Sequence, residues 1–256
     1  MTGSDPSNPL WSVAPAKFTL AAGQVHVWLV RADDAALCMA CCENLLATAE
    51  RERAARFKFE KDRRLYTVAH AALRSILADY LKLIPEDLQF ETGPRGKPRL
   101  APTFRKDSLE FNLSHSFEVA LIAVTRERDI GVDVEHIKEQ FAFAEVAERY
   151  FTTREVSALR ALPEALQRRA FYQCWTSKEA FLKANGVGLS GELDEVEIVL
   201  AGEGRVQVKS TLPGWYLSEL NPCAGYVGAV AWEGTDFDLN CYGWTGPAQG
   251  TRHSHS

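Results

Sequence analysis

The chain contains 256 residues and has a formal net charge of −5, with 46% hydrophobic and 25% charged residues. This length suffices for one large domain or two small ones with cores of their own, and the composition is typical of a globular protein. The negative charge argues against a general nucleic-acid-binding surface. No run approaches the about 20 apolar residues that a membrane-spanning helix needs, and residues 1–9 lack the features of a signal peptide. We therefore expect a cytoplasmic protein.

Six cysteines are spread along the chain. Cys38 and Cys41 have the spacing of half a zinc site, but no second Cys or His pair follows at a suitable distance. The pattern favours thiols that are buried or without a role, in a reducing compartment.

The first half of the chain predicts a strand, then helices, then strands. Residues 1–22, rich in Pro, Ser and Ala, predict a flexible leader, and residues 23–128 predict an N-terminal lobe. Period-2 alternation and helical periodicity predict a strand at 25–30, helices at 42–59 and 62–83, and strands at 88–92, 109–113 and 119–124. Pro85 ends the second helix, and the polar segment 114–116 is expected between the last two strands.

The same order begins again near residue 130. We expect a strand at 130–135, helices at 143–150, 153–161 and 164–185, and strands at 196–200, 206–210, 215–220, 225–233 and 236–242. Gly186 fits the C-cap of the longest helix. Residues 129–242 thus predict a second, C-terminal lobe, and residues 243–256 a disordered tail. The result is an α+β protein whose duplicated architecture rests on element order alone, because no sequence repeat is visible.

Two acidic residues stand close together on the strand at 130–135. Asp133 and Glu135 are two positions apart, so their side chains leave the same face. Two adjacent carboxylates repel each other unless a cation, a proton or a basic group lies between them. A solvated sheet edge also explains such a pair, and the pair alone favours this alternative over a cation site.

The long helix at 164–185 carries a second charged pair. Glu179 and Lys183 have the favourable i,i+4 order, which at a surface contributes only about 0.3–0.5 kcal/mol. Apolar neighbours such as Phe171 and Trp175 indicate a helix that is packed on most sides, so that these charges need partners. Oxygen donors without nearby Cys or His suit a hard ion, and Mg²⁺ bound together with a phosphate is the common case.

The first half supplies cations that suit a phosphate. The segment 50–64 contains seven Arg and Lys side chains, including Arg53, but four acidic residues interleave with them, so a solvated face explains it as well. Arg95 and Lys97 lie in a stiff loop where backbone amides can also approach an anion. Asn112, Ser114 and His115 add polar groups at the end of a strand, although an isolated histidine of this kind is more often simply hydrogen-bonded.

Together these residues resemble the Sfp-type 4′-phosphopantetheinyl transferases. The matching blocks, each weak alone but specific as a set, are Arg95-Gly-Lys-Pro98, Phe111-Asn-Leu-Ser-His-Ser116, Ile130-Gly-Val-Asp-Val-Glu135, Arg149-Tyr-Phe-Thr-Thr-Arg-Glu155, Phe171-Tyr-Gln-Cys-Trp-Thr-Ser-Lys-Glu-Ala-Phe-Leu-Lys-Ala184 and Gly186-Val-Gly-Leu189. Their order and spacing agree with the family from about residue 25 to residue 235. The resemblance implies a monomer of two α/β lobes related by a pseudo-twofold axis, with coenzyme A in the cleft between them.

The resemblance also implies the reaction. The 4′-phosphopantetheine arm of coenzyme A would move to a serine of an apo acyl or peptidyl carrier protein, with release of adenosine 3′,5′-bisphosphate. Such carriers serve fatty-acid, polyketide or nonribosomal peptide synthesis. A magnesium-dependent phosphohydrolase acting on coenzyme A or a related nucleotide, and a non-catalytic carrier-binding module, are the alternatives. Neither nucleic acid nor a membrane is expected as a partner.

The family's functional residues map onto this sequence as follows. Asp133, Glu135 and Glu179 correspond to the magnesium site, with Glu135 at a position that varies in the family. Lys183 would neutralise charge on the diphosphate, and either Glu179 or a metal-bound water would take the serine proton. The residues that correspond to coenzyme A contacts are Arg53, Lys97, Asn112, Ser114 and His115, to which we add Arg95 by charge and position.

Two further positions are informative. Glu155 corresponds to an acid near the site with an unsettled role. Some relatives carry Lys where Glu50 stands, which predicts that phosphate binding here depends more on Arg53 and His115. A cationic and apolar rim is expected for the acidic carrier. Arg154, Arg160, Arg168 and Arg169 are candidates for it, although a solvated helical face explains them as well.

Overall fold

The computed structural model describes residues 11–15, 18–93, 96–186, 198–201, 207–210, 214–234 and 238–247. The first half contains β1 (Ser12–Val13), β2 (Gln24–Arg31), α1 (Met39–Leu45), α2 (Thr48–Ala55), α3 (Glu60–Leu81), the 3₁₀ helix η1 (Pro85–Asp87), β3 (Phe90–Thr92), β4 (Pro98–Leu100), the 3₁₀ helix η3 (Pro102–Asp107), β5 (Leu109–Ser116) and β6 (Val119–Arg126). The second half contains β7 (Ile130–His136), α4 (Phe143–Tyr150), α5 (Thr153–Ala161), α6 (Glu164–Asn185), β8 (Ile198–Ala201), β9 (Gln207–Ser210), β10 (Trp215–Leu220), β11 (Tyr226–Glu233) and β12 (Asp238–Gly243).

The two halves have the same connectivity. Each begins with a strand (β2 or β7), continues through two short helices into a helix of 22 residues (α3 or α6), and ends in an antiparallel hairpin (β5–β6 or β10–β11). In each half the opening strand pairs antiparallel with the second strand of the hairpin. The predicted α+β class is confirmed, and the repeated strand order is the one that a duplicated architecture requires.

The last strand returns to the first half. β12 pairs in parallel with β2, and β1 pairs in parallel with β12, so the larger sheet has the order β1-β12-β2-β6-β5. Part of the predicted leader and the first residue of the predicted tail therefore belong to this sheet. In addition, the backbone N–H of Trp244 donates to the carbonyl of Leu29 at 2.9 Å.

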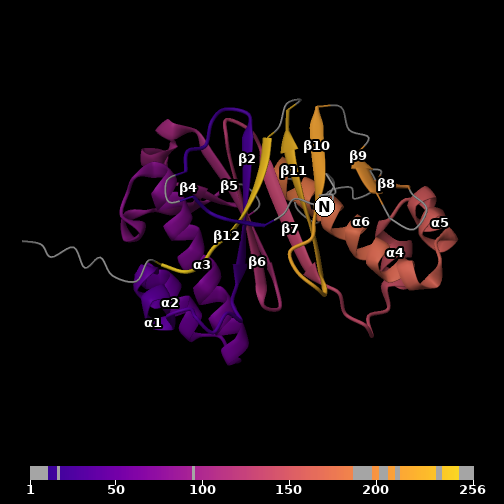
Figure 1. Cartoon of the computed structure of the whole chain (residues 1–256), viewed down its shortest axis with the longest axis horizontal. Coiled ribbons are helices and arrows are strands. Elements are labelled where there is room, and N and C mark those ends of the chain that lie inside the picture. The colour runs from indigo at the N-terminus through magenta and orange to yellow at the C-terminus, as the bar shows by residue number, and fades with distance from the viewer. Residues whose placement is uncertain are drawn as a thin grey trace, which may run out of the picture.

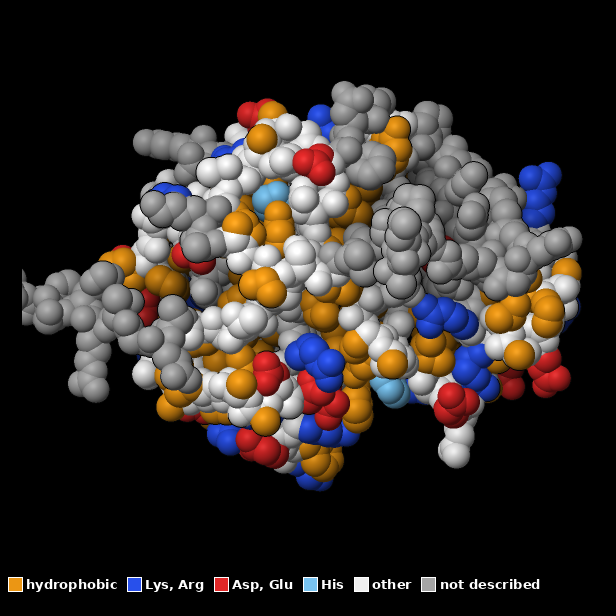
Figure 2. Space-filling model, viewed as in Figure 1, with side chains coloured by type: hydrophobic (Ala, Val, Ile, Leu, Met, Phe, Trp, Pro, Cys, Tyr) orange, Lys and Arg blue, Asp and Glu red, His pale blue; other side chains and the backbone are white. Residues whose placement is uncertain are grey.

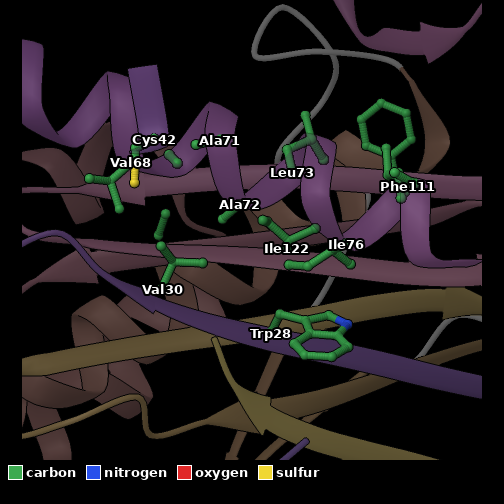
Figure 3. Packing of buried hydrophobic residues seen from close by; sticks show 14 of the residues in the cluster. Trp28, Val30, Cys42, Val68, Ala71, Ala72, Leu73, Ile76, Phe111 and Ile122 are labelled. Carbon is green, nitrogen blue, oxygen red and sulfur yellow. The ribbon is translucent and has the colours of Figure 1, made fainter. Parts of the chain in front are cut away.

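The two sheets lie face to face between two layers of helices (Figure 1). One core lies between α3 and the larger sheet, a second lies between α6 and the sheet β10-β11-β7, and a third lies between the sheets. Strand β2 supplies two of these cores, because Val25, Val27 and Leu29 face the other sheet while Trp28 and Val30 face α3. Figure 3 shows Trp28 and Val30 packed beneath the α3 side chains. This burial of both faces explains the nearly continuous apolar runs in the strands.

Several predicted boundaries change in the structure. The helix expected at 42–59 is two helices, because Leu46 and Ala47 adopt extended backbone between α1 and α2. The helix expected to start at Asp62 starts at Glu60. Residues 114–116 lie inside β5, and the turn falls at Phe117 and Glu118. The helix predicted for 164–185 is confirmed, with Gly186 in the left-handed conformation (φ 68°) at its C-cap.

The thiols also differ from the prediction. Cys38 and Cys41 form a disulfide at the start of α1. The spacing of three residues that suggested half a zinc site therefore serves a cross-link inside the first helical turn. Cys42, Cys174, Cys223 and Cys241 are free. Among the described residues, no helix is long and apolar enough to span a membrane.

Candidate active site

The site begins where helix α6 lies directly on strand β7. A Cβ atom at Gly131 would come within 2.0 Å of the Ala180 carbonyl oxygen and 2.4 Å of the Ala184 nitrogen. Only a residue without a side chain allows this approach. Because Ala180 and Ala184 directly follow Glu179 and Lys183 in the sequence, the contact fixes these two side chains against the strand that carries Asp133.

Asp133 and Lys183 form the centre of the site. The Asp133 side chain is buried, with 4% of its surface exposed. Its Oδ1 accepts a hydrogen bond from Lys183 Nζ at 2.6 Å and another from Ser114 Oγ at 2.8 Å. Lys183 Nζ also donates to Ser114 Oγ at 2.9 Å. Three residues predicted separately, on β5, β7 and α6, therefore meet at one carboxylate oxygen.

Glu179 lies beside this group, and no described residue forms a hydrogen bond with its Oε1. Its carboxylate is buried, and burial raises its pKa to about 7, with the charge of Asp133 adding to the effect and Lys183 opposing it. Glu179 Oε1 and Asp133 Oδ2 are both buried and have no hydrogen-bond partner among the described residues. Buried carboxylate oxygens normally have partners, so two such atoms in one site indicate space for a ligand.

Glu135 lies at the outer side of the site. Its Oε2 accepts a hydrogen bond from Ser116 Oγ at 2.7 Å, and the backbone N–H of His136 donates to the same hydroxyl at 3.1 Å. Burial raises the pKa of Glu135, whereas the hydrogen bond from Ser116 lowers it. Ser116 was not identified from the sequence. It could have been, because it lies two positions after Ser114 and therefore on the same face of β5.

The donor set fits a divalent cation that is also bound by its substrate. Within the described part of the chain, no group of three Asp, Glu, His or Cys side chains is arranged to hold a metal. Mg²⁺, however, commonly takes only one or two carboxylates and completes its shell with water and substrate phosphates. The two unpaired oxygens of Asp133 and Glu179 are hard donors of this kind.

Two predicted coenzyme A contacts lie at the junction of the halves. Lys97 Nζ donates to the carbonyl of Ile130 at 2.9 Å, and burial lowers its pKa. Asn112 Oδ1 accepts from the backbone N–H of Val132 at 2.8 Å and so connects β5 to β7. Both side chains hold the first half against the strand that carries Asp133. Arg95 lies outside the described residues.

Arg53 and His115 lie on the first half. Arg53 is exposed, lies over the Tyr66 ring at 5.5 Å, and lines a surface hollow of about 520 Å³ with Arg56 and Phe57. Partial desolvation lowers the pKa of His115, and the charge of Lys183 lowers it further. On the face shown in Figure 2, acidic and basic side chains are mixed together along the lower middle of the molecule, so the cations there do not form one continuous field.

The structure gives a reason for the acid at position 50. Glu50 Oε2 accepts from Arg74 Nε at 2.6 Å and from the backbone N–H of Ala47 at 2.9 Å. Arg74 is buried, with 3% of its side chain exposed, and a buried charge needs a partner. Glu50 thus stabilises the packing of α2 on α3.

Glu155 and Lys178 form a buried ion pair. The Nζ–Oε1 distance is 2.9 Å, and the two side chains are 1% and 0% exposed. Glu155 Oε1 also accepts from the backbone N–H of Ile198, and its Oε2 accepts from that of Thr152, each at 2.7 Å. Both oxygens of Glu155 are therefore occupied within the protein.

Comparison with known proteins decides the family. The chain is 38% identical over 234 residues to the 4′-phosphopantetheinyl transferase HetI of Nostoc sp., covering 91% of this chain and 95% of the relative. It is 30% identical to the 4′-phosphopantetheinyl transferase Sfp of Bacillus subtilis, covering 76% of this chain and 85% of the relative. The chain belongs to the 4′-phosphopantetheinyl transferase superfamily.

Two family models and a solved structure match parts of this transferase. Residues 129–231 match the 4′-phosphopantetheinyl transferase superfamily, and residues 33–127 match the family described as 4′-phosphopantetheinyl transferase, N-terminal. The crystal structure of Thermotoga maritima holo-[acyl-carrier-protein] synthase aligns with a TM-score of 0.34 and 21% identity, covering 42% of this chain and 63% of that one. The relatives and the family models confirm the resemblance seen in the sequence motifs, and the chain is an enzyme of this class.

Proposed function

We propose that this enzyme transfers the 4′-phosphopantetheine arm of coenzyme A to a serine of an apo acyl or peptidyl carrier protein. The observation that carries the proposal is the meeting of Asp133, Lys183 and Glu179, where one ammonium group and two unpaired buried carboxylate oxygens converge. In the reaction, the serine oxygen forms a bond to the phosphorus that bears the pantetheine arm. The bond from that phosphorus to the bridging oxygen breaks, and adenosine 3′,5′-bisphosphate leaves.

Asp133 and Glu179 would hold Mg²⁺ through their free oxygens, with Glu135 as a third donor at the outer side. Bound Mg²⁺ supplies charge neutralisation at the diphosphate and polarises the phosphorus–oxygen bond. Because the protein offers so few donors, the phosphates of coenzyme A complete the shell in this proposal.

Lys183 is positioned by its two partners rather than free to rotate. With Nζ fixed by Asp133 Oδ1 and Ser114 Oγ, its charge is held where negative charge develops on the leaving phosphate. A preorganised cation of this kind stabilises a transition state without further reorganisation.

Glu179 is the candidate acceptor of the serine proton. Its pKa of about 7, in the protein without a cation, suits a group that exchanges a proton near neutral pH. Because a carboxylate that also binds the cation is a weaker base, a water held by the cation would be the alternative acceptor. Glu155 receives no substrate-contacting role in this proposal, because Lys178, Thr152 and Ile198 already occupy its oxygens.

For coenzyme A, we assign the nucleotide end to the first half. Arg53 at the edge of the hollow supplies a cation for phosphate, next to the aromatic ring of Phe57. The remaining proposed contacts are Arg95, Lys97, Asn112, Ser114 and His115. The hydrogen bonds of Lys97 and Asn112 to β7 imply that they shape the junction as well as the ligand site.

The test is a transfer assay followed by mass spectrometry of the acceptor. With Mg²⁺ and coenzyme A, an apo carrier protein should gain the mass of one phosphopantetheine arm, and chelation of the metal should stop the reaction. A panel of carriers that all remain unmodified would contradict the proposal. Phosphopantetheine released without a carrier would favour the phosphohydrolase, and carrier binding without a mass change would favour the binding module. A monomeric state, a cytoplasmic location and the absence of nucleic-acid or membrane partners remain predictions from the sequence.

A further inference from the structure

An aromatic side chain stands at the surface in the turn between β5 and β6. Phe117 is 50% exposed and occupies the first position of a two-residue turn with φ of 56°. This left-handed conformation favours glycine and costs other residues about 1–2 kcal/mol. A large apolar residue that is exposed and has a strained backbone contributes little to the stability of the fold. Such strain is typical of residues at functional sites.

Phe117 belongs to a small group of side chains from three elements. Its ring stacks on that of His136 at the end of β7, with 4.9 Å between ring centroids. Lys61, in the first turn of α3, holds its Nζ 5.6 Å from the Phe117 ring centroid. We call Lys61, Phe117 and His136 the Phe117 patch. At the same end of α3, Phe59 is 56% exposed, and Lys58 lies over its ring.

The Phe117 patch borders the candidate active site. Phe117 directly follows Ser116, whose hydroxyl donates to Glu135 Oε2 at 2.7 Å. His136 directly follows Glu135, and its backbone N–H donates to the same hydroxyl at 3.1 Å. A macromolecule that delivers a side chain to the carboxylates therefore arrives beside this patch.

The charge of the patch is positive although the chain as a whole is negative. Two acids adjoin Lys61 in the sequence: Glu60 is paired with Arg63 at 2.7 Å, whereas Asp62 has no such pair among the described residues. Among the described residues, neither Lys58 nor Lys61 forms an ion pair with an acid. The combination of exposed aromatic rings and unpaired ammonium groups fits a partner that presents an apolar side chain flanked by carboxylates.

Three of the four arginines that the sequence offered for an acidic partner are engaged in contacts within the second half. Arg160 is paired with Glu148. Arg168 donates to the carbonyls of Lys138 and Phe141, at 3.0 and 2.9 Å. Arg169 donates to Asn221. These contacts tie the second half together, and they make this region a weaker candidate for an acidic partner than the Phe117 patch.

We propose that the Phe117 patch docks the carrier protein, receiving an apolar side chain and acidic groups next to the acceptor serine. The inference rests on the proposed function, because that function supplies the partner. Docking there places the serine beside Glu135, while coenzyme A occupies the separate hollow lined by Arg53, Arg56 and Phe57.

The test compares patch variants in steady-state transfer to an apo acyl carrier protein. Phe117→Gly removes the ring and relieves the backbone, so folding is preserved, and Lys61→Glu reverses the charge. Each should raise KM for the carrier about tenfold, the size expected for an interface anchor, with kcat unchanged. Coenzyme A affinity, measured by calorimetry, should stay within about twofold, and Lys61→Glu should weaken the dependence of KM on salt.

Two controls match these changes in exposure and chemistry. Ile84 is 56% exposed, and Lys82 is also exposed; both lie beyond the opposite end of α3, about 30 Å from Lys61 along the helix axis. Ile84→Ala and Lys82→Glu should leave KM unchanged. Patch variants with unaltered carrier KM, or with a kcat loss alone, would overturn the docking site while the proposed function stands. A wild-type enzyme that modifies no carrier would instead overturn the proposed function itself.

Discussion

Gly131 and Ala180 bring helix and strand into backbone contact at the centre of the site. The 2.0 Å that would separate a Cβ at position 131 from the Ala180 carbonyl oxygen leaves no room even for a methyl group. Glu179 and Lys183 flank this contact on α6, and Asp133 lies two residues beyond it on β7. The geometry of the carboxylates and the lysine therefore depends on a residue that has no chemistry of its own.

Gly131→Ala should displace α6 and separate Lys183 from Asp133. We expect the free energy of unfolding to fall by about 1–3 kcal/mol, as for other overpacked cores. Turnover per folded molecule should also fall, because the carboxylates and the lysine no longer have the same geometry. Gly243→Ala is the control, because the nearest atom to a Cβ there is 4.0 Å away. Denaturant unfolding and transfer assays measure both variants; normal turnover in Gly131→Ala would show that the contact does not set the site.

Lys183 and Ser114 should differ in their contribution to turnover. Lys183→Met removes the cation from Asp133 and should lower kcat by about 10²–10³, the effect of losing one preorganised charge-stabilising group. Ser114→Ala removes a hydrogen bond to each of two charged partners, worth about 1.5–3 kcal/mol apiece, but keeps the Lys183 cation next to Asp133, and should therefore lower kcat less than Lys183→Met does. Steady-state kinetics at saturating coenzyme A test the order, and equal effects would contradict it.

Binding of Mg²⁺ should weaken below neutral pH. The pKa of Glu179 is raised to about 7 by burial and by Asp133, so below this pH a proton competes with the cation. The apparent Mg²⁺ affinity should then fall by up to about tenfold for each pH unit below 7, with proton release on binding. Calorimetry with the protein and Mg²⁺ in buffers of different ionisation enthalpy measures this. Glu179→Gln should bind more weakly and show a flatter profile; an unchanged slope would exclude Glu179 as the titrating ligand.

The buried pair of Glu155 and Lys178 should be sensitive to the loss of one partner. Lys178→Met leaves a buried carboxylate without its cation and should destabilise the protein by about 3–5 kcal/mol. Adding Glu155→Gln should recover part of this loss, because the amide oxygen still accepts from the backbone while the buried charge is gone. Glu148→Gln, which breaks the exposed pair with Arg160, should cost less than about 1 kcal/mol. Chemical denaturation of these variants, of Glu155→Gln alone and of the wild type gives the values, and additive single and double changes at positions 155 and 178 would refute the coupling.

His26 should make folding stability depend on pH. It is 2% exposed, its Nδ1 lies 2.7 Å from the Tyr80 hydroxyl, and burial lowers its pKa to about 4. The unfolded chain binds this proton below about pH 6.5, so its stabilising contribution is complete above that pH and is lost as the pH falls toward 4. Between pH 7.5 and pH 5, this residue should contribute about 2 kcal/mol of the loss. Urea unfolding at both pH values should show a smaller change in the free energy of unfolding for His26→Gln than for the wild type. An equal change would show that other groups cause the pH dependence.

The local elements followed from the sequence where one signal dominated. The helix Glu164–Asn185 was predicted to the residue, because helical periodicity ended at Gly186, which adopts the left-handed C-cap. The helix expected at 42–59 was less well defined, since no Pro or Gly marks the break at Leu46 and Ala47. Residues 114–116 looked like a turn because they are polar, yet they continue β5, since Ser114 and Ser116 are bonded to carboxylates on β7.

The sequence by itself determined the class of the protein and its acids and cations, because motif spacing and side-chain chemistry are local properties. Only the tertiary structure decided how they meet. Asp133 is shared by Lys183, 50 positions away, and Ser114, 19 positions away, and these two partners are themselves 69 positions apart. Sequence periodicity cannot predict contacts between residues so far apart. The structure also distinguishes acids that look alike in the sequence. Glu155 forms a buried ion pair with Lys178, whereas Glu179 Oε1 has no hydrogen-bond partner among the described residues. The physical reason is that burial and partner geometry, which depend on the packing of α6 against β7 at Gly131, determine whether a carboxylate stabilises the fold or remains available for chemistry.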